Sequence, residues 1–218
     1  MVTGAVSLPR SASVGAVPEI MVPAARLHRW LDNFAASHGP ATLATVDGAL
    51  RGNAPDGSWF AARLPFGRGY GGPPDLDGFL GGVLPPNAWG LLLVRKGGFA
   101  VARLHGHRTV ESKVGRRHVQ GRTKAGGQSQ QRFSRRRDNQ ARQAYEAAAD
   151  HAARILGQRL TALVTGGDHG AVEAVLADPR LTGLPVVPPW LAVPDPRRGV
   201  LETAVADACS VRMTVTNA

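Results

Sequence analysis

Residues 89–105 read WGLLLVRKGGFAVARLH, and their pattern is the strongest indication of how the chain folds. Trp89–Arg95 is an apolar run of strand length, which predicts a buried strand. Gly97-Gly98 is typical of a hairpin turn, and Phe99–His105 follows as the partner strand. We therefore expect an antiparallel hairpin in the centre of a sheet that is covered by helices.

The residues that follow alternate between strand and helix patterns. A third strand is predicted at Thr109–Val119, and a long helix at Ser129–Leu156 has an apolar stripe on one side and arginines on the other. The remaining predicted elements are a strand at Leu160–Thr165, a helix at Asp168–Ala177 with Asp168 as N-cap, a short apolar piece at Val186–Val187, a helix at Arg198–Ala208 and a strand at Ser210–Val215. Three antiparallel strands followed by this alternation predict an α/β fold, a mixed sheet with flanking helices.

The residues before Trp89 predict a smaller region. An apolar spacing of three and four residues over 23–37 indicates an amphipathic helix, and strands are expected at Ala41–Val46 and Trp59–Leu64, with a short helix at Asp75–Gly82. We divide the chain into a flexible tail at 1–18, a helix-plus-strands lobe at 19–86 and an α/β domain at 87–218.

Composition excludes several classes of protein. The 218 residues contain no stretch near the roughly 18 consecutive apolar residues of a membrane span. The first 20 residues lack the basic and apolar regions of a secretory signal. The single cysteine, Cys209, excludes an intrachain disulfide and a cysteine-based zinc site. We expect a cytoplasmic protein that makes no membrane contact.

The positive charge is concentrated in one segment. Residues 113–142 contain ten Lys or Arg against the single acid Asp138, and so carry +9 of the formal net charge of +10. Charge focused in this way is typical of a protein that binds a polyanion.

A glycine–glutamine loop lies inside the basic segment, where residues 121–137 read GRTKAGGQSQQRFSRRR. Gly126 and Gly127 allow close approach of the backbone to a partner, and Gln128 and Gln130 bring uncharged amides. Surrounding cations favour RNA phosphate, and with only Phe133 as a nearby aromatic residue the binding should depend on the backbone rather than on base stacking. The predicted RNA-binding residues are Lys113, Arg116, Arg117, Arg122, Lys124, Arg132, Arg135, Arg136 and Arg137.

Familiar catalytic motifs are missing. The chain has no G-x-S-x-G and no P-loop pattern, and a formal G-x-G-x-x-G at 67–72 is followed by two prolines instead of a helix. His105 and His107 have no acidic or histidine ligand nearby in the sequence. We expect no metal and no cofactor.

Residues Trp89–Gln140 resemble a known family, the bacterial branch of release-factor-like peptidyl-tRNA hydrolases. This branch is related to the middle domain of the archaeal and eukaryotic class 1 release factor and to the eukaryotic enzyme that frees nascent chains from stalled ribosomes. The resemblance implies an RNase H-like or ribosomal-protein-like α/β sheet. It also implies a catalytic loop with a G-x-x-Q pattern that enters the peptidyl transferase centre.

Two glutamines fit the catalytic position that the resemblance implies. Gly127-Gln128-Ser129-Gln130 matches G-x-x-Q and indicates Gln130, which we prefer because a basic helix follows. Gly126-Gly127-Gln128 is a literal Gly-Gly-Gln, the tripeptide of termination factors, and indicates Gln128. We find no codon-reading domain, so we do not expect stop-codon recognition.

The hypothesis is a peptidyl-tRNA hydrolase, a carboxylic ester hydrolase whose partners are peptidyl-tRNA and the large ribosomal subunit. One alternative is an endonuclease of the same fold that cuts tRNA near its 3′ end. Another is a non-enzymatic rRNA-binding protein, for which the basic segment alone would suffice.

Overall fold

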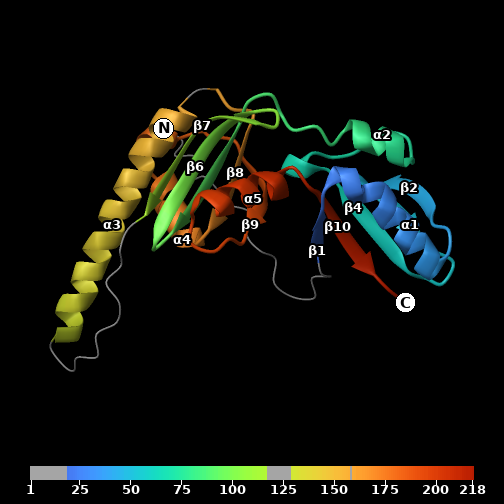
Figure 1. Ribbon diagram of the computed structural model, residues 1–218, viewed down its shortest axis with the longest axis horizontal. Helices are drawn as coiled ribbons and strands as arrows, with labels where there is room; N and C mark the ends of the chain where they lie inside the picture. Colours follow the sequence, from blue (N-terminus) through green and yellow to red (C-terminus); the bar gives the residue numbers. More distant parts are fainter. Residues whose placement is uncertain (1–18, 117–128, 158) are drawn as a thin grey trace. The chain divides into compact units, whose positions relative to one another are not determined.

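The computed structural model describes residues 19–116, 129–157 and 159–218, in which the chain forms two compact units (Figure 1). Each unit is built on its own five-stranded sheet. One unit contains Pro86–Val186 and Trp190–Ala204. The other contains the described chain up to Pro85 together with Val187–Pro189 and Val205–Ala218.

The sheet of the first unit is mixed, as predicted. It consists of β5 (Trp89–Arg95), β6 (Gly98–His105), β7 (Arg108–Arg116), β8 (Ala162–Gly167) and β9 (Val186–Leu191). Its order is β7-β6-β5-β8-β9; β5, β6 and β7 are antiparallel neighbours, whereas β8 and β9 run parallel to β5. An antiparallel meander extended by two parallel strands is the RNase H-like arrangement that the resemblance implies.

The central strand β5 is buried on both faces. Successive side chains of a strand point to opposite faces, and both Leu91 and Leu92 are fully buried. The long helix α3 (Ser129–Leu156) packs over β6 and beside α4 (His169–Leu176). Buried residues from these helices and strands form one core, which includes Leu92, Val101, Ala152, Ile155, Leu163 and Val172. The 3-10 turn η3 (Pro179–Leu181) and α5 (Arg198–Ala208) complete the helical elements after α4.

The sheet of the second unit is entirely antiparallel. Its order is β1-β10-β4-β3-β2, from β1 (Glu19–Val22), β10 (Val211–Thr216), β4 (Trp59–Arg63), β3 (Ala49–Asn53) and β2 (Thr42–Val46). The other elements are η1 (Ala24–Arg26), α1 (Leu27–His38), η2 (Pro65–Gly67) and α2 (Leu76–Gly81).

An aromatic cluster joins α1 to this sheet. Trp30 and Phe34 lie one turn apart on α1, and their ring centroids are 5.3 and 5.1 Å from that of Phe60 on β4, both in edge-on geometry. Such pairs contribute about 0.5–1.5 kcal/mol each beyond the area they bury. The apolar stripe predicted over 23–37 is therefore the core-facing side of α1.

Three strands differ from the sequence predictions. β1 and β3 were not predicted, because Glu19–Val22 is short and Ala49–Asn53 (ALRGN) reads as turn sequence. The predicted last strand exists as β10, but it lies between β1 and β4 in the second unit. The sequence prediction places all residues of 87–218 in one domain. In the structure, residues 205–218 instead belong to the same compact unit as the described residues up to Pro85.

Candidate functional site

The predicted catalytic loop connects the last strand of the antiparallel meander to α3. β7 ends at Arg116 and α3 begins at Ser129. The helix therefore starts one residue before Gln130, which is the second residue of α3. Gln128, Gly126, Gly127, Arg117, Arg122 and Lys124 lie outside the described residues.

The predicted RNA-binding residues that are described fall on two adjacent elements. Lys113 is exposed on β7, and Arg116 is the last residue of that strand. The others occupy backbone positions in the first three turns of α3: Arg132, Arg135, Arg136 and Arg137. Residues 132, 135 and 136 share one face of a helix, because they are spaced by three and four positions.

The two halves of α3 are specialised. The second half is anchored to the sheet by fully buried residues, among them Ala148, Ala152 and Ile155. An ion pair between Arg154 and Glu111 of β7 ties the same half to the neighbouring edge strand. The first half carries the arginines, and in Figure 1 it continues beyond the end of the sheet. One helix thus runs from the core to Ser129, the first residue after the candidate loop.

The carboxylates at the end of the parallel strands are already engaged. In open α/β sheets, ligands commonly bind at the carboxyl ends of the strands. At this edge Arg95 lies 3.4 Å from Asp168, 3.7 Å from Asp195, and donates a hydrogen bond of 2.8 Å to the carbonyl of Val193. These contacts hold the chain after β9 against β5, which is a structural role.

Asp168 occupies the N-cap position of α4, as predicted, but its side chain makes no capping hydrogen bond. Its carboxylate lies toward Arg95 instead. Burial, together with the nearby Asp168 charge, raises the pKa of Tyr145 on α3, so this phenol stays neutral at physiological pH.

Cys209 and His169 are two further side chains of a kind that can take part in catalysis. Burial raises the pKa of the Cys209 thiol to about 11, which suppresses the thiolate. His169 stacks on Trp190, with ring centroids 3.6 Å apart. Within the described residues, no group of three or more His, Cys, Asp or Glu side chains could hold a metal ion. No helix in the described part of the chain combines the length and apolar character of a bilayer span.

Comparison with known protein families shows which family the chain belongs to. A family model described as Actinobacteria/chloroflexi VLRF1 release factor matches residues 87–214, which is more than half of the chain. The chain belongs to this release factor family. The matched region starts two residues before β5 and ends within β10, so it contains the whole mixed sheet, the candidate loop and α3. The family assignment agrees with the release-factor resemblance that residues Trp89–Gln140 indicate.

Other comparisons add little. No curated protein gives a significant match. A solved structure described as "Archaeal protein" is 16% identical with a TM-score of 0.35, and the match covers 70% of this chain and 48% of that one. This chain therefore spans about half the length of that protein.

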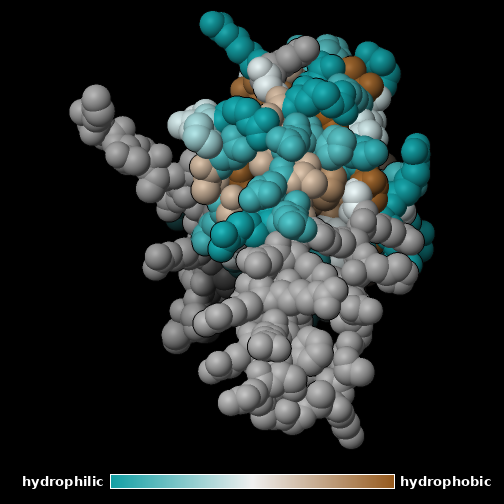
Figure 2. Space-filling model, turned by 90° about the vertical axis from the view of Figure 1, so that its left-hand side faces the viewer, coloured by the Kyte–Doolittle hydropathy of each residue, from teal (hydrophilic) through white to brown (hydrophobic). Residues whose placement is uncertain are grey.

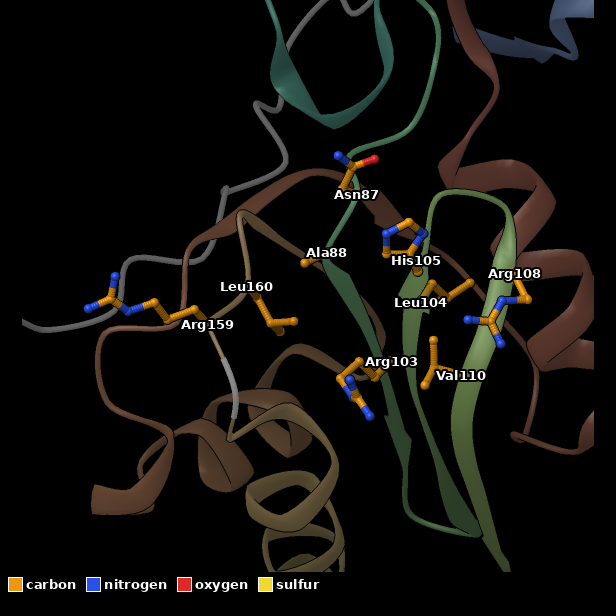
Figure 3. Close-up of a pocket in the computed structure, with 9 residues that line it drawn as sticks. All are labelled: Asn87, Ala88, Arg103, Leu104, His105, Arg108, Val110, Arg159 and Leu160. Atoms are coloured by element: carbon orange, nitrogen blue, oxygen red, sulfur yellow. The ribbon is translucent and has the colours of Figure 1, made fainter.

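The sequence predictions missed one feature of this domain. A cavity beyond the C-terminal end of α3 is lined by Arg103, His105, Arg108 and Arg159, together with five other residues (Figure 3). The signal in the sequence was the density of cations in 103–108, which reads RLHGHR. It was obscured because Arg159 joins the group only through the fold.

Proposed function

We propose that this release factor is a peptidyl-tRNA hydrolase that frees nascent chains from stalled ribosomes. The loop Gly127-Gln128-Ser129-Gln130 would enter the large subunit and act on the ester that joins the peptide to tRNA. The observation that carries this proposal is the family match, which spans the G-x-x-Q motif and the basic helix α3 that begins within it.

The amide of Gln130 is suited to positioning rather than to proton abstraction. A neutral amide is not a strong general base at pH 7, but it both donates and accepts hydrogen bonds. It can therefore orient a water molecule toward the ester carbonyl. Positioning of a reactant accounts for several kcal/mol of barrier lowering in well-aligned reactions.

The start of α3 supports an anionic partner at this place. The first four N–H groups of a helix have no partner within it, and they carry about half a positive charge. Gln130 lies within these four residues, and four arginines follow in the next two turns. Phosphates near the 3′ end of tRNA, and the oxyanion that forms during ester hydrolysis, are both favoured next to such a terminus.

The test is the substitution Gln130→Ala, assayed on purified ribosomal complexes that carry a labelled peptidyl-tRNA. We expect release to fall at least about a hundredfold, because the water is no longer oriented. Sedimentation with the large subunit should be unchanged. Gln143→Ala is the matched control, since Gln143 is exposed further along the same helix.

Release by Gln130→Ala at the wild-type rate would remove Gln130 from the mechanism. The parallel variant Gln128→Ala then decides whether the Gly-Gly-Gln reading is the correct one. The size of the tRNA product separates ester hydrolysis, which leaves the 3′ end intact, from an endonuclease. Sedimentation without release in every condition would favour the non-enzymatic rRNA-binding alternative.

A further inference from the structure

The cavity beyond the C-terminal end of α3 has a volume of about 220 Å³. It lies where β5 begins, where β6 turns into β7 and where the chain leaves α3 (Figure 3). Since one water occupies about 30 Å³ of liquid, this volume accommodates a phosphate group together with part of a sugar.

The lining is strongly cationic. Arg103, Arg108 and Arg159 line the cavity, and none of its nine lining residues is acidic. Glu111, one residue beyond Val110 on β7, is already paired with Arg154. The negative charge of Glu111 is therefore balanced by Arg154 and does not cancel the positive charge of the arginines that line the cavity.

The polar groups are accessible to a ligand. Asn87, His105, Arg108 and Arg159 are all exposed, and they surround the apolar side chains of Leu104, Val110 and Leu160. In Figure 3, Arg108 extends from β7 toward the middle of the group, whereas Arg159 lies beyond Leu160 with its guanidinium directed away from the other lining residues. Long arginine side chains at a rim can turn onto a phosphate, which guanidinium groups bind with paired hydrogen bonds.

The cavity lies beyond the C-terminal end of α3, and the candidate loop precedes the first residue of this helix in the chain. The loop precedes Ser129 at the start of α3, whereas Arg159 and Leu160 follow its last residue, Leu156. The 28 residues of α3 correspond to a length of about 42 Å at ~1.5 Å per residue. An RNA that reaches from the start of α3 to the cavity therefore has to span about 42 Å.

We propose that the cavity binds a backbone phosphate in the duplex arm of the tRNA whose 3′ end reaches the loop. This inference rests on the proposed function and adds a second contact to it. The cavity supplies a fixed anchor, and α3 sets the distance between the anchor and the reactive end. Recognition of this kind depends on the sugar–phosphate backbone and on duplex length, and not on base sequence.

The experiment measures binding of labelled RNA hairpins, with a single-stranded 3′ end and a duplex of 6 or 18 base pairs, to the whole protein. The test variant is Arg108→Gln/Arg159→Gln, because both side chains are exposed and their loss leaves the core intact. The control is Arg26→Gln/Arg29→Gln, which removes two exposed charges from the other unit.

Wild-type protein should bind the 18-pair hairpin at least about tenfold more tightly than the 6-pair hairpin, since only the long duplex reaches the cavity. The test variant should lose this advantage, and the slope of log affinity against log salt should fall by about 1.5 for the long hairpin. The control variant should stay within about twofold of wild type on both RNAs.

Equal affinity of the test variant and the control for the long hairpin would overturn the proposal, as would an equal loss on both duplex lengths. The result is independent of the release reaction. If wild-type protein shows the length-dependent binding but releases no peptide, the anchor stands and the proposed function fails. If Gln130→Ala abolishes release while the cavity variant binds normally, the proposed function stands and the anchor fails.

Discussion

At the scale of single residues, the two glycines that end β8 show how tightly the mixed sheet is packed. A Cβ atom on Gly166 would fall against the carbonyl oxygen of Leu191, and one on Gly167 against the carbonyl oxygen of Val94. Gly167 also has φ = 105°, a conformation that other residues rarely adopt. The close contact of β8 with its neighbours therefore depends on the absence of side chains at these positions.

The substitution Gly167→Ala should destabilise the protein by about 2–4 kcal/mol, from backbone strain and from the clash with Val94. Chemical denaturation measures this change as a shift in the midpoint of unfolding, provided that the dependence of the unfolding free energy on denaturant concentration is the same for both proteins. Gly170→Ala is the matched control on α4, where a Cβ atom would meet no neighbour within 4 Å. It should stabilise by about 0.5–1 kcal/mol, because it replaces a helical glycine by alanine. A stability of Gly167→Ala within about 0.5 kcal/mol of wild type would contradict the packing argument.

At the scale of secondary structure, one arginine fastens α3 to the segment after α4. Arg180 of η3 donates hydrogen bonds of 2.7 Å to Asp150 of α3 and to Asp178. Asp178 also caps η3 by accepting a bond from the backbone N–H of Arg180. These hydrogen bonds lower the pKa of Asp178 from 3.8 to about 2. The contact fixes the anchored half of α3, on which the placement of its first half depends.

This contact should make stability dependent on acidic pH. Because the folded pKa of Asp178 lies below its unfolded value, its contribution is complete above about pH 4 and is lost as the pH falls toward 2. Thermal unfolding of Asp178→Asn should therefore show a smaller loss of stability across this window than wild type does. Asp32→Asn, on an exposed position of α1, should follow the wild-type profile. Identical profiles for wild type and Asp178→Asn would rule out this role.

At the scale of the whole molecule, the first and last strands of the family-matched region, β5 and β10, belong to different sheets. β5 is the centre of the mixed sheet, whereas β10 lies inside the antiparallel sheet, hydrogen-bonded to β1 on one side and β4 on the other. Met213 of β10 is fully buried in the core of that sheet, with Phe60 and Leu50. The last strand of the chain is thus an interior strand of a sheet whose other members all come before residue 64.

The substitution Met213→Ala should lower the free energy of unfolding by about 2–5 kcal/mol, because it opens a cavity in this core. Hydrogen exchange should accelerate most in the paired strands Glu19–Val22 and Trp59–Arg63. Met21→Ala, a partly exposed position of the edge strand β1, should cost much less. Exchange that accelerates in neither paired strand would show that β10 does not hold this sheet together.

The chain has two groups of cations, and only one of them could be predicted from the sequence. The basic segment 113–142 is visible in the sequence, because its ten cations fall within 30 consecutive residues and β7 and α3 follow directly from local patterns. The surface in Figure 2 is coloured by residue type, and hydrophilic residues dominate the part shown in colour. The cationic cavity was not predicted, because Arg103 and Arg159 are 56 positions apart and meet only when α3 folds back along β6.

Sequence alone determined the mixed α/β sheet, the long helix, the G-x-x-Q candidate and the release-factor relationship. Each of these rests on short-range patterns, such as apolar runs, turn glycines and adjacent motif residues, whose physical meaning does not depend on distant partners. Tertiary structure decided the rest: the membership of β10 in the other sheet, the engagement of Asp168 by Arg95, and the cavity beyond α3. These features depend on which surfaces are buried together, and burial joins residues that are far apart in the chain.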